Sequence, residues 1–153
     1  MMKRLEGEWD RLDQALIHFM RTYGVRLLRV VLAVTFIWFG GLKILGVSPV
    51  ASLVAQTVHW VQPKFFVPFL GLWEVIVGVG LLLGVALRLV LLLFWLQMAG
   101  TFLVLVLHPE LSFQSGNPLL LTVTGEFVIK NLVLIAAGLV IGSTVAREHG
   151  TKK

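Results

Sequence analysis

The sequence has no cysteine, and this absence excludes several kinds of chemistry. Without a thiol, the chain forms no disulfide, offers no thiolate nucleophile and supplies no ligand for a zinc–cysteine site or an iron–sulfur cluster. Charge is also scarce, because Asp, Glu, Lys and Arg make up only 14% of the 153 residues. A typical soluble domain has about 25% charged residues. The composition therefore argues against an ordinary soluble enzyme, and the high apolar content excludes a disordered chain.

Long apolar runs stand in place of the missing charge, since 58% of the residues are hydrophobic. A transmembrane helix needs about 20 mainly apolar residues. Four runs of this kind predict spans at about residues 26–46, 67–87, 88–107 and 122–142. We expect an all-α integral membrane protein whose transmembrane domain, residues 25–143, is an antiparallel bundle of four transmembrane helices.

The basic residues predict the orientation of this bundle. Ten of the 13 Lys and Arg residues lie before the first span, between the second and third spans, or after the fourth span. The positive-inside rule then places both termini, including a tail at residues 144–153, in the cytoplasm. The net charge of +5 is thereby attributed to topology and anionic lipid, and no nucleic acid is expected as a partner.

Two further helices are expected outside the spans. Apolar residues recur at helical spacing in the leader, residues 1–24, and predict an amphipathic helix at the cytoplasmic interface, with a partner-binding helix as the alternative. Ser48 as N-cap and Pro49 at the first helical position predict a short interfacial helix on the outer face. Pro63 is expected to end this helix and Pro68 to start the second span. The second outer loop, rich in turn-forming residues, is expected to be a structured connection or a lid.

Charged side chains inside the spans are the most informative feature of the sequence. Each costs about 2.5–3.5 kcal/mol on insertion scales, so each needs an explanation. Lys43, Glu74, Glu126, Lys130 and the neighbouring Asn131 are all expected in the outer half of the bilayer. The sequence does not place Glu74 beside a specific partner, but Lys43 is the obvious candidate by depth. Glu126 and Lys130 share one helix face at positions i and i+4.

We expect these polar groups to line an amphiphilic cavity that opens outward, with Trp38 and Trp73 in its walls. Gln97 and His108 lie on one face of the third span and join the lining. A flat apolar molecule with polar ends, such as a quinone, would fit this cavity. The candidate ligand-binding residues are Lys43, Glu74, Gln97, Glu126, Lys130, Asn131, Trp38, Trp73 and His108, and no catalytic residue is assigned. The alternative is a purely structural network that fixes the register of the helices.

A metal or haem site is not expected. His59 and His108 both lie near the outer interface, but no pair of histidines has the spacing typical of metal ligands on one helix. The interiors of the spans contain no histidine that would ligate a haem iron.

Three segments resemble DoxX-like membrane proteins: FIWFGGLKILGVSP at residues 36–49, LGLWEVIVGVGLLLG at residues 70–84, and TGEFVIKNLVLIAAGLVIGS at residues 124–143. The first segment looks most like the YkgB-type branch. The resemblance implies a four-span protein of the bacterial inner membrane. Members of the family are associated with membrane redox systems, including subunits of a thiosulfate–quinone oxidoreductase and partners of oxidative-stress enzymes. The charged positions in the spans, together with Asn131, match recurrent polar positions of the family pattern.

These observations support three hypotheses of decreasing strength. The first is an accessory subunit that binds a quinone or another small amphiphile for a partner redox enzyme, rather than a self-sufficient enzyme. The second is a non-catalytic, chaperone-like scaffold or assembly protein of the membrane. The third is a transporter or channel. Lipid is an expected partner in every case, and a homo-oligomer is left open.

Overall fold

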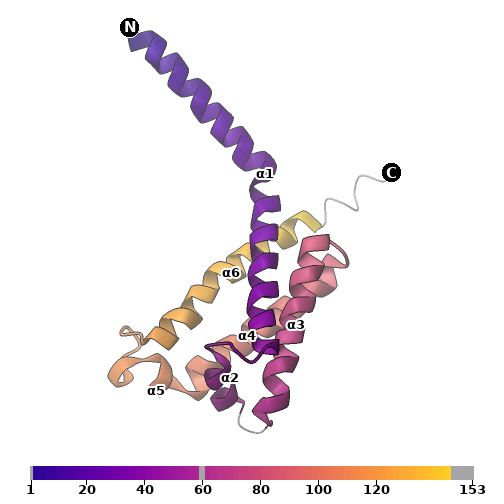
Figure 1. Ribbon diagram of the computed structural model, residues 1–153. Helices are drawn as coiled ribbons and strands as arrows, with labels where there is room; N and C mark the ends of the chain where they lie inside the picture. The colour runs from indigo at the N-terminus through magenta and orange to yellow at the C-terminus, as the bar shows by residue number, and fades with distance from the viewer. Residues whose placement is uncertain (1, 59–60, 146–153) are drawn as a thin grey trace.

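The computed structural model describes residues 2–58 and 61–145, with side chains from residue 9 onward. The described chain is mainly helical and contains no named strand (Figure 1). Four of its helices are long and apolar enough to cross a membrane, which confirms the predicted all-α membrane bundle. The predicted tail lies largely outside the described residues. The elements in order are α1 (Met2–Ile44), α2 (Ala51–Thr57), α3 (Pro63–Leu83), α4 (Leu87–Leu107), α5 (Pro109–Ser112), the 3-10 turn η1 (Gln114–Gly116) and α6 (Val123–Val145).

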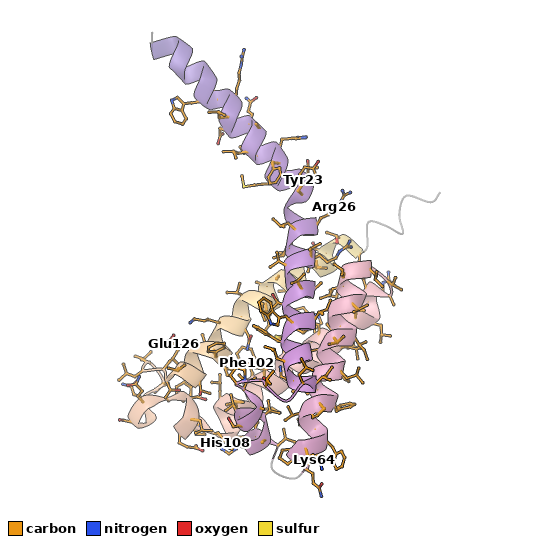
Figure 2. All side chains as sticks on the ribbon, in the orientation of Figure 1. Tyr23, Arg26, Lys64, Phe102, His108 and Glu126 are labelled. Atoms are coloured by element: carbon orange, nitrogen blue, oxygen red, sulfur yellow. The ribbon has the colours of Figure 1, made fainter. Side chains whose placement is uncertain are left out.

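The leader and the first span form one continuous helix, α1, of 43 residues. At about 1.5 Å per residue this helix is far longer than the roughly 30 Å of bilayer hydrocarbon. Its N-terminal part extends away from the bundle, and α1 bends in the region of Tyr23 and Arg26 (Figures 1 and 2). No proline interrupts α1, so the leader continues directly into the span.

α1 packs most extensively on α3, and glycines allow this close approach. A Cβ atom built on Gly40 of α1 would lie 2.5 Å from the carbonyl oxygen of Gly71, and one built on Gly71 of α3 would lie 2.6 Å from that of Gly40. A Cβ atom built on Gly78 of α3 would likewise lie 2.8 Å from the carbonyl oxygen of Ala33 of α1. The two backbones therefore meet where a larger side chain would hold them apart.

The second half of the bundle is built around Phe94 of α4. Its side chain is fully buried and contacts Phe36 of α1, with ring centroids 5.4 Å apart. It also lies against Gly138 of α6, where an added Cβ would meet the ring at 2.6 Å. Phe94 thus joins α1, α4 and α6 in one apolar core.

We expect Phe94→Ala to lower the free energy of unfolding by about 3–5 kcal/mol, because it removes the ring and leaves a cavity among three helices. Thermal unfolding in detergent measures this change. Leu96 of the same helix faces outward, and Leu96→Ala is the matched control with a small expected effect. Equal losses in the two variants would contradict the central role of Phe94.

The connection between α4 and α6 is structured. Of the two predictions for this loop, a structured connection or a lid, the structure therefore agrees with the first. The N–H of Thr122 donates to the carbonyl of Ser112 at 3.0 Å, and its hydroxyl donates to the carbonyl of Leu111 at 2.5 Å. The same hydroxyl oxygen accepts the N–H of Gly125 at 3.1 Å and so caps the start of α6. Thr122 therefore fixes the loop and the helix start together.

The prediction that Ser48 caps a helix was wrong. The carbonyl of Ser48 accepts the N–H of Ala51 at 3.2 Å, and Val50 has φ −93° and ψ 3°. These are features of a type I turn with Pro49 at its second position, and α2 begins only after that turn. The helix then ends at Thr57, before the predicted stop at Pro63.

The second span also begins and ends earlier than predicted. Pro63 occupies the start of α3, and Pro68 lies inside the helix. Because Pro68 is near the helix start, its missing N–H costs α3 only the bond to the carbonyl of Lys64. At the other end, Gly84 has φ 70°, a left-handed conformation that ends α3 at Leu83.

Candidate functional site

Lys43 and Glu74 form a buried ion pair between α1 and α3. The Lys43 Nζ lies 2.6 Å from Glu74 Oε2 and 2.8 Å from Oε1, and the two side chains are only 6% and 9% exposed. Each charged residue follows the glycine of the helix crossing, Gly40 or Gly71, by three positions. Residues three apart lie on one helix face, so the close backbone contact also brings the charges together. The pairing predicted from membrane depth is confirmed.

Gln97 of α4 extends this pair to a third helix. Its Nε2 donates to Glu74 Oε1 at 2.5 Å, so the carboxylate receives hydrogen bonds from both neighbouring helices. The Gln97 Oε1 is buried and accepts no hydrogen bond from the described residues. Leaving a buried acceptor unpaired costs about 1–3 kcal/mol. A water or hydroxyl group beside Gln97 Oε1 would therefore complete the network.

An open groove of about 390 Å³ lies beside the ion pair, between the end of α1, α2 and the start of α3. Lys43 belongs both to the ion pair and to the groove wall. Lys64 also lines the groove, and Figure 2 shows it at the tip of the bundle, at the end that carries α2. We call this end the α2 end. The other lining residues combine one hydroxyl with small apolar groups and include Ser52, Ala51, Ala55, Val67 and Pro68.

Glu126 and Lys130 form a separate pair on the surface of α6. The Lys130 Nζ lies 3.2 Å from Glu126 Oε2, and the side chains are 57% exposed for Glu126 and 71% for Lys130. α6 packs mainly against α4 and α1, and Figure 2 shows Glu126 away from α3. Asn131, the next residue, is half-buried. The structure therefore unites Lys43, Glu74 and Gln97 but places the α6 pair elsewhere.

The two predicted wall tryptophans have different positions. Trp38 is 65% exposed on the outer surface of α1 and does not line the groove. Trp73 is half-buried beside the core, and its Nε1 donates to the carbonyl of Leu93 at 3.3 Å, which connects α3 to α4. Neither ring lines the groove.

His108 lies at the end of α4, outside the groove. Its Nδ1 is 3.0 Å from Glu110 Oε1. The pKa of the exposed Glu110 carboxyl is lowered below its usual value, because the carboxylate accepts a hydrogen bond from the backbone of Glu110 and also contacts His108. Among the described residues, no group of three or more His, Asp and Glu side chains is placed to hold a metal ion, and His59 lies outside them.

Two groups of site residues were not predicted from the sequence: the crossing glycines Gly40 and Gly71, and the groove residues Lys64 and Ser52. A signal for the glycines exists, because Gly-x-x-Lys and Gly-x-x-Glu occur at the same spacing in the two spans. Lys64 and Ser52 carry no comparable signal, since their approach depends on how α2 folds back on α3.

Comparison with known proteins adds a family to this geometry. No curated protein and no solved structure matches the chain. The sequence model of the DoxX family matches residues 24–108, which hold the spanning part of α1, α2, α3 and α4, and with them Lys43, Glu74 and Gln97. This match covers more than half of the 153 residues. The chain is therefore a multi-pass membrane protein that belongs to the DoxX family.

Proposed function

We propose that the protein binds a quinone or a similar small amphiphile in the groove at the α2 end, as an accessory subunit of a membrane redox system. One observation carries this proposal: Lys43 lines the groove and is held in place by Glu74. An ammonium group has three N–H donors, and the two oxygens of Glu74 leave Lys43 with capacity to donate to a ligand oxygen. Because the ion pair fixes the lysine beforehand, little ordering remains when the ligand binds.

The chemistry divides between this chain and a partner. Lys43 donates a hydrogen bond to a carbonyl of the ligand. Glu74 passes protons to the ligand when the ligand is reduced, and accepts them when the ligand is oxidised. Gln97 keeps the carboxylate in position. The electrons come from, or go to, a partner redox enzyme.

The membrane placement is part of the same proposal. Arg26, Arg29 and Arg88 lie at the end of the bundle opposite the groove, and the positive-inside rule favours the cytoplasm for that end. The groove then faces outward from a bacterial inner membrane, with both termini in the cytoplasm. The YkgB-type branch of the family is proposed on the FIWFGGLKILGVSP segment.

A variant that fills the groove tests the binding function. Ala55→Phe places a ring in the groove and leaves the ion pair unchanged, whereas Gln56→Phe adds the same ring at an exposed neighbouring position of α2. Solvent extraction of the full chain, purified in mild detergent, followed by mass spectrometry measures the retained amphiphile. We expect Ala55→Phe to retain about ten-fold less than the wild type, a change of about 1.4 kcal/mol, and Gln56→Phe to retain as much as the wild type. Equal retention in both variants, or bulk phospholipid alone, would contradict the proposal.

A second candidate, a membrane scaffold, is favoured by the N-terminal part of α1. This part leaves the bundle (Figure 1). It also exposes an apolar stripe, which predicts a contact with the membrane surface or with another protein. The exposed residues are Trp9, Leu12, Leu16, Phe19, Met20 and Tyr23.

Crosslinking in native membranes distinguishes the scaffold from the amphiphile binder. If the protein is a scaffold, we expect the double variant Leu12→Gln/Leu16→Gln to lose the partner that the wild type crosslinks. The amount of amphiphile that the variant retains does not bear on this test. Capture of the same partner by this variant and by the wild type argues against the scaffold.

A further inference from the structure

A second groove of about 390 Å³ lies at the opposite end of the bundle, between the start of α4 and the end of α6. Figure 1 shows the α3–α4 turn and the end of α6 at this same end. We call it the Arg88 groove. It is lined by Arg88, Leu91, Leu92, Trp95, Gly142 and Val145.

The walls of the Arg88 groove are mostly apolar. Gly142 has no side chain, and a Cβ built there would lie in ordinary van der Waals contact with Leu91 Cδ1, at 3.5 Å, so only a larger side chain at this position would fill the groove. Trp95 is held edge-on against the buried Phe94, with ring centroids 5.4 Å apart at 79°. An apolar slot of this kind on a membrane helix pair suits an acyl chain.

The rim of the groove is positively charged. Arg88 is exposed in the first turn of α4 and makes no salt bridge with the described residues. Arg29 of α1 adds a positive charge at the same end of the bundle, since its Nη1 lies 3.2 Å from the position of a Cβ built on Gly84, the residue that follows α3, but it does not line the groove. The described segments at this end, residues 24–34, 78–92 and 134–145, contain no Asp or Glu. The described residues at this end therefore offer no acidic side chain that could compete with an anion for Arg88.

We propose that the Arg88 groove binds an anionic phospholipid. The phosphate pairs with the Arg88 guanidinium, whose planar donors match phosphate oxygens, and one acyl chain lies along Trp95 over Gly142. An anionic headgroup is favoured over a zwitterionic one, because the ammonium of a zwitterionic lipid finds no acidic side chain among the described residues at this end. The bound lipid connects α4 to α6, and by mass action it stabilises the folded bundle.

Lipid binding to the full chain in detergent, followed by native mass spectrometry, tests this assignment. The probes are phosphatidylglycerol and phosphatidylcholine with identical acyl chains. We expect the chain to retain phosphatidylglycerol preferentially, and Arg88→Gln to weaken that retention by about ten-fold, since the loss removes a charge-assisted contact. Arg26→Gln removes the same charge from an exposed position of α1 outside the groove, and it is expected to have little effect.

A second pair of variants tests the groove itself while keeping Arg88. Gly142→Leu fills the hollow and is expected to reduce retention, whereas Ser143→Leu adds the same side chain at an exposed neighbouring position and is not. Circular dichroism and the melting temperature show whether Gly142→Leu folds. If Gly142→Leu does not fold, the comparison of Arg88→Gln with Arg26→Gln decides the outcome. Equal retention of the two lipids, equal losses for Arg88→Gln and Arg26→Gln, or displacement by inorganic phosphate alone would overturn the proposal.

Discussion

Lys43→Met is expected to lower the free energy of unfolding by about 3–5 kcal/mol, because it leaves the Glu74 carboxylate buried without its counter-charge. The side chains of this pair are 6% and 9% exposed, so water offers the orphaned carboxylate little compensation. Reversible unfolding of the full chain in mixed micelles measures the change.

The double variant Lys43→Met/Glu74→Gln separates the ion pair from simple packing. It removes both charges and keeps an amide that can bond to Gln97, so we expect it to be more stable than Lys43→Met alone. Lys130→Met and Glu126→Gln on α6 are the matched controls, with expected losses below about 1 kcal/mol, since that pair is exposed. If the two substitutions in the Lys43–Glu74 pair are strictly additive, the ion pair has no energetic coupling and the account of the site is wrong.

Gly40→Ala is expected to cost about 1–3 kcal/mol and to separate α1 from α3, because its Cβ would lie 2.5 Å from the carbonyl oxygen of Gly71. Neither backbone can yield without moving a whole helix. The separation also lengthens the Lys43–Glu74 contact one turn away, so the loss of stability and the loss of amphiphile retention are expected together.

Gly41→Ala is the control for this substitution, since no atom lies within 4 Å of a Cβ built there. Alanine has a higher helix propensity than glycine, so Gly41→Ala is expected to be neutral or mildly stabilising. The melting temperature and the quinone retention are measured for Gly40→Ala and for Gly41→Ala, which change neighbouring glycines of one helix. Similar behaviour of both variants would refute the close crossing at Gly40.

Hydropathy and charge were sufficient to predict the four spans and to name Lys43 as the candidate partner of Glu74. Length and apolar content determine which segments span a membrane, and depth limits which charges can meet. The rotation of α6 was not predictable in the same way. Glu126 and Lys130 satisfy each other at i and i+4, so their sequence is compatible with an inward or an outward face.

Local sequence motifs were less informative where the same residues are typical of two different local structures. Ser48-Pro49 fits a helix start and a type I turn equally well, and only the bond from Ala51 back to Ser48 selects the turn. Pro63 and Pro68 both suit the first turn of a helix. The fold begins α3 at the earlier one, where α2 lies against it.

Photo-crosslinking of an azido-quinone to the purified full chain, followed by peptide mapping, tests the central claim that the groove beside Lys43 receives the ligand. We predict labelling within residues 51–67, on α2 and the start of α3, and its loss in Ala55→Phe but not in Gln56→Phe. Labelling spread over the exposed faces of α4 and α6, or labelling that Ala55→Phe leaves unchanged, would contradict the account.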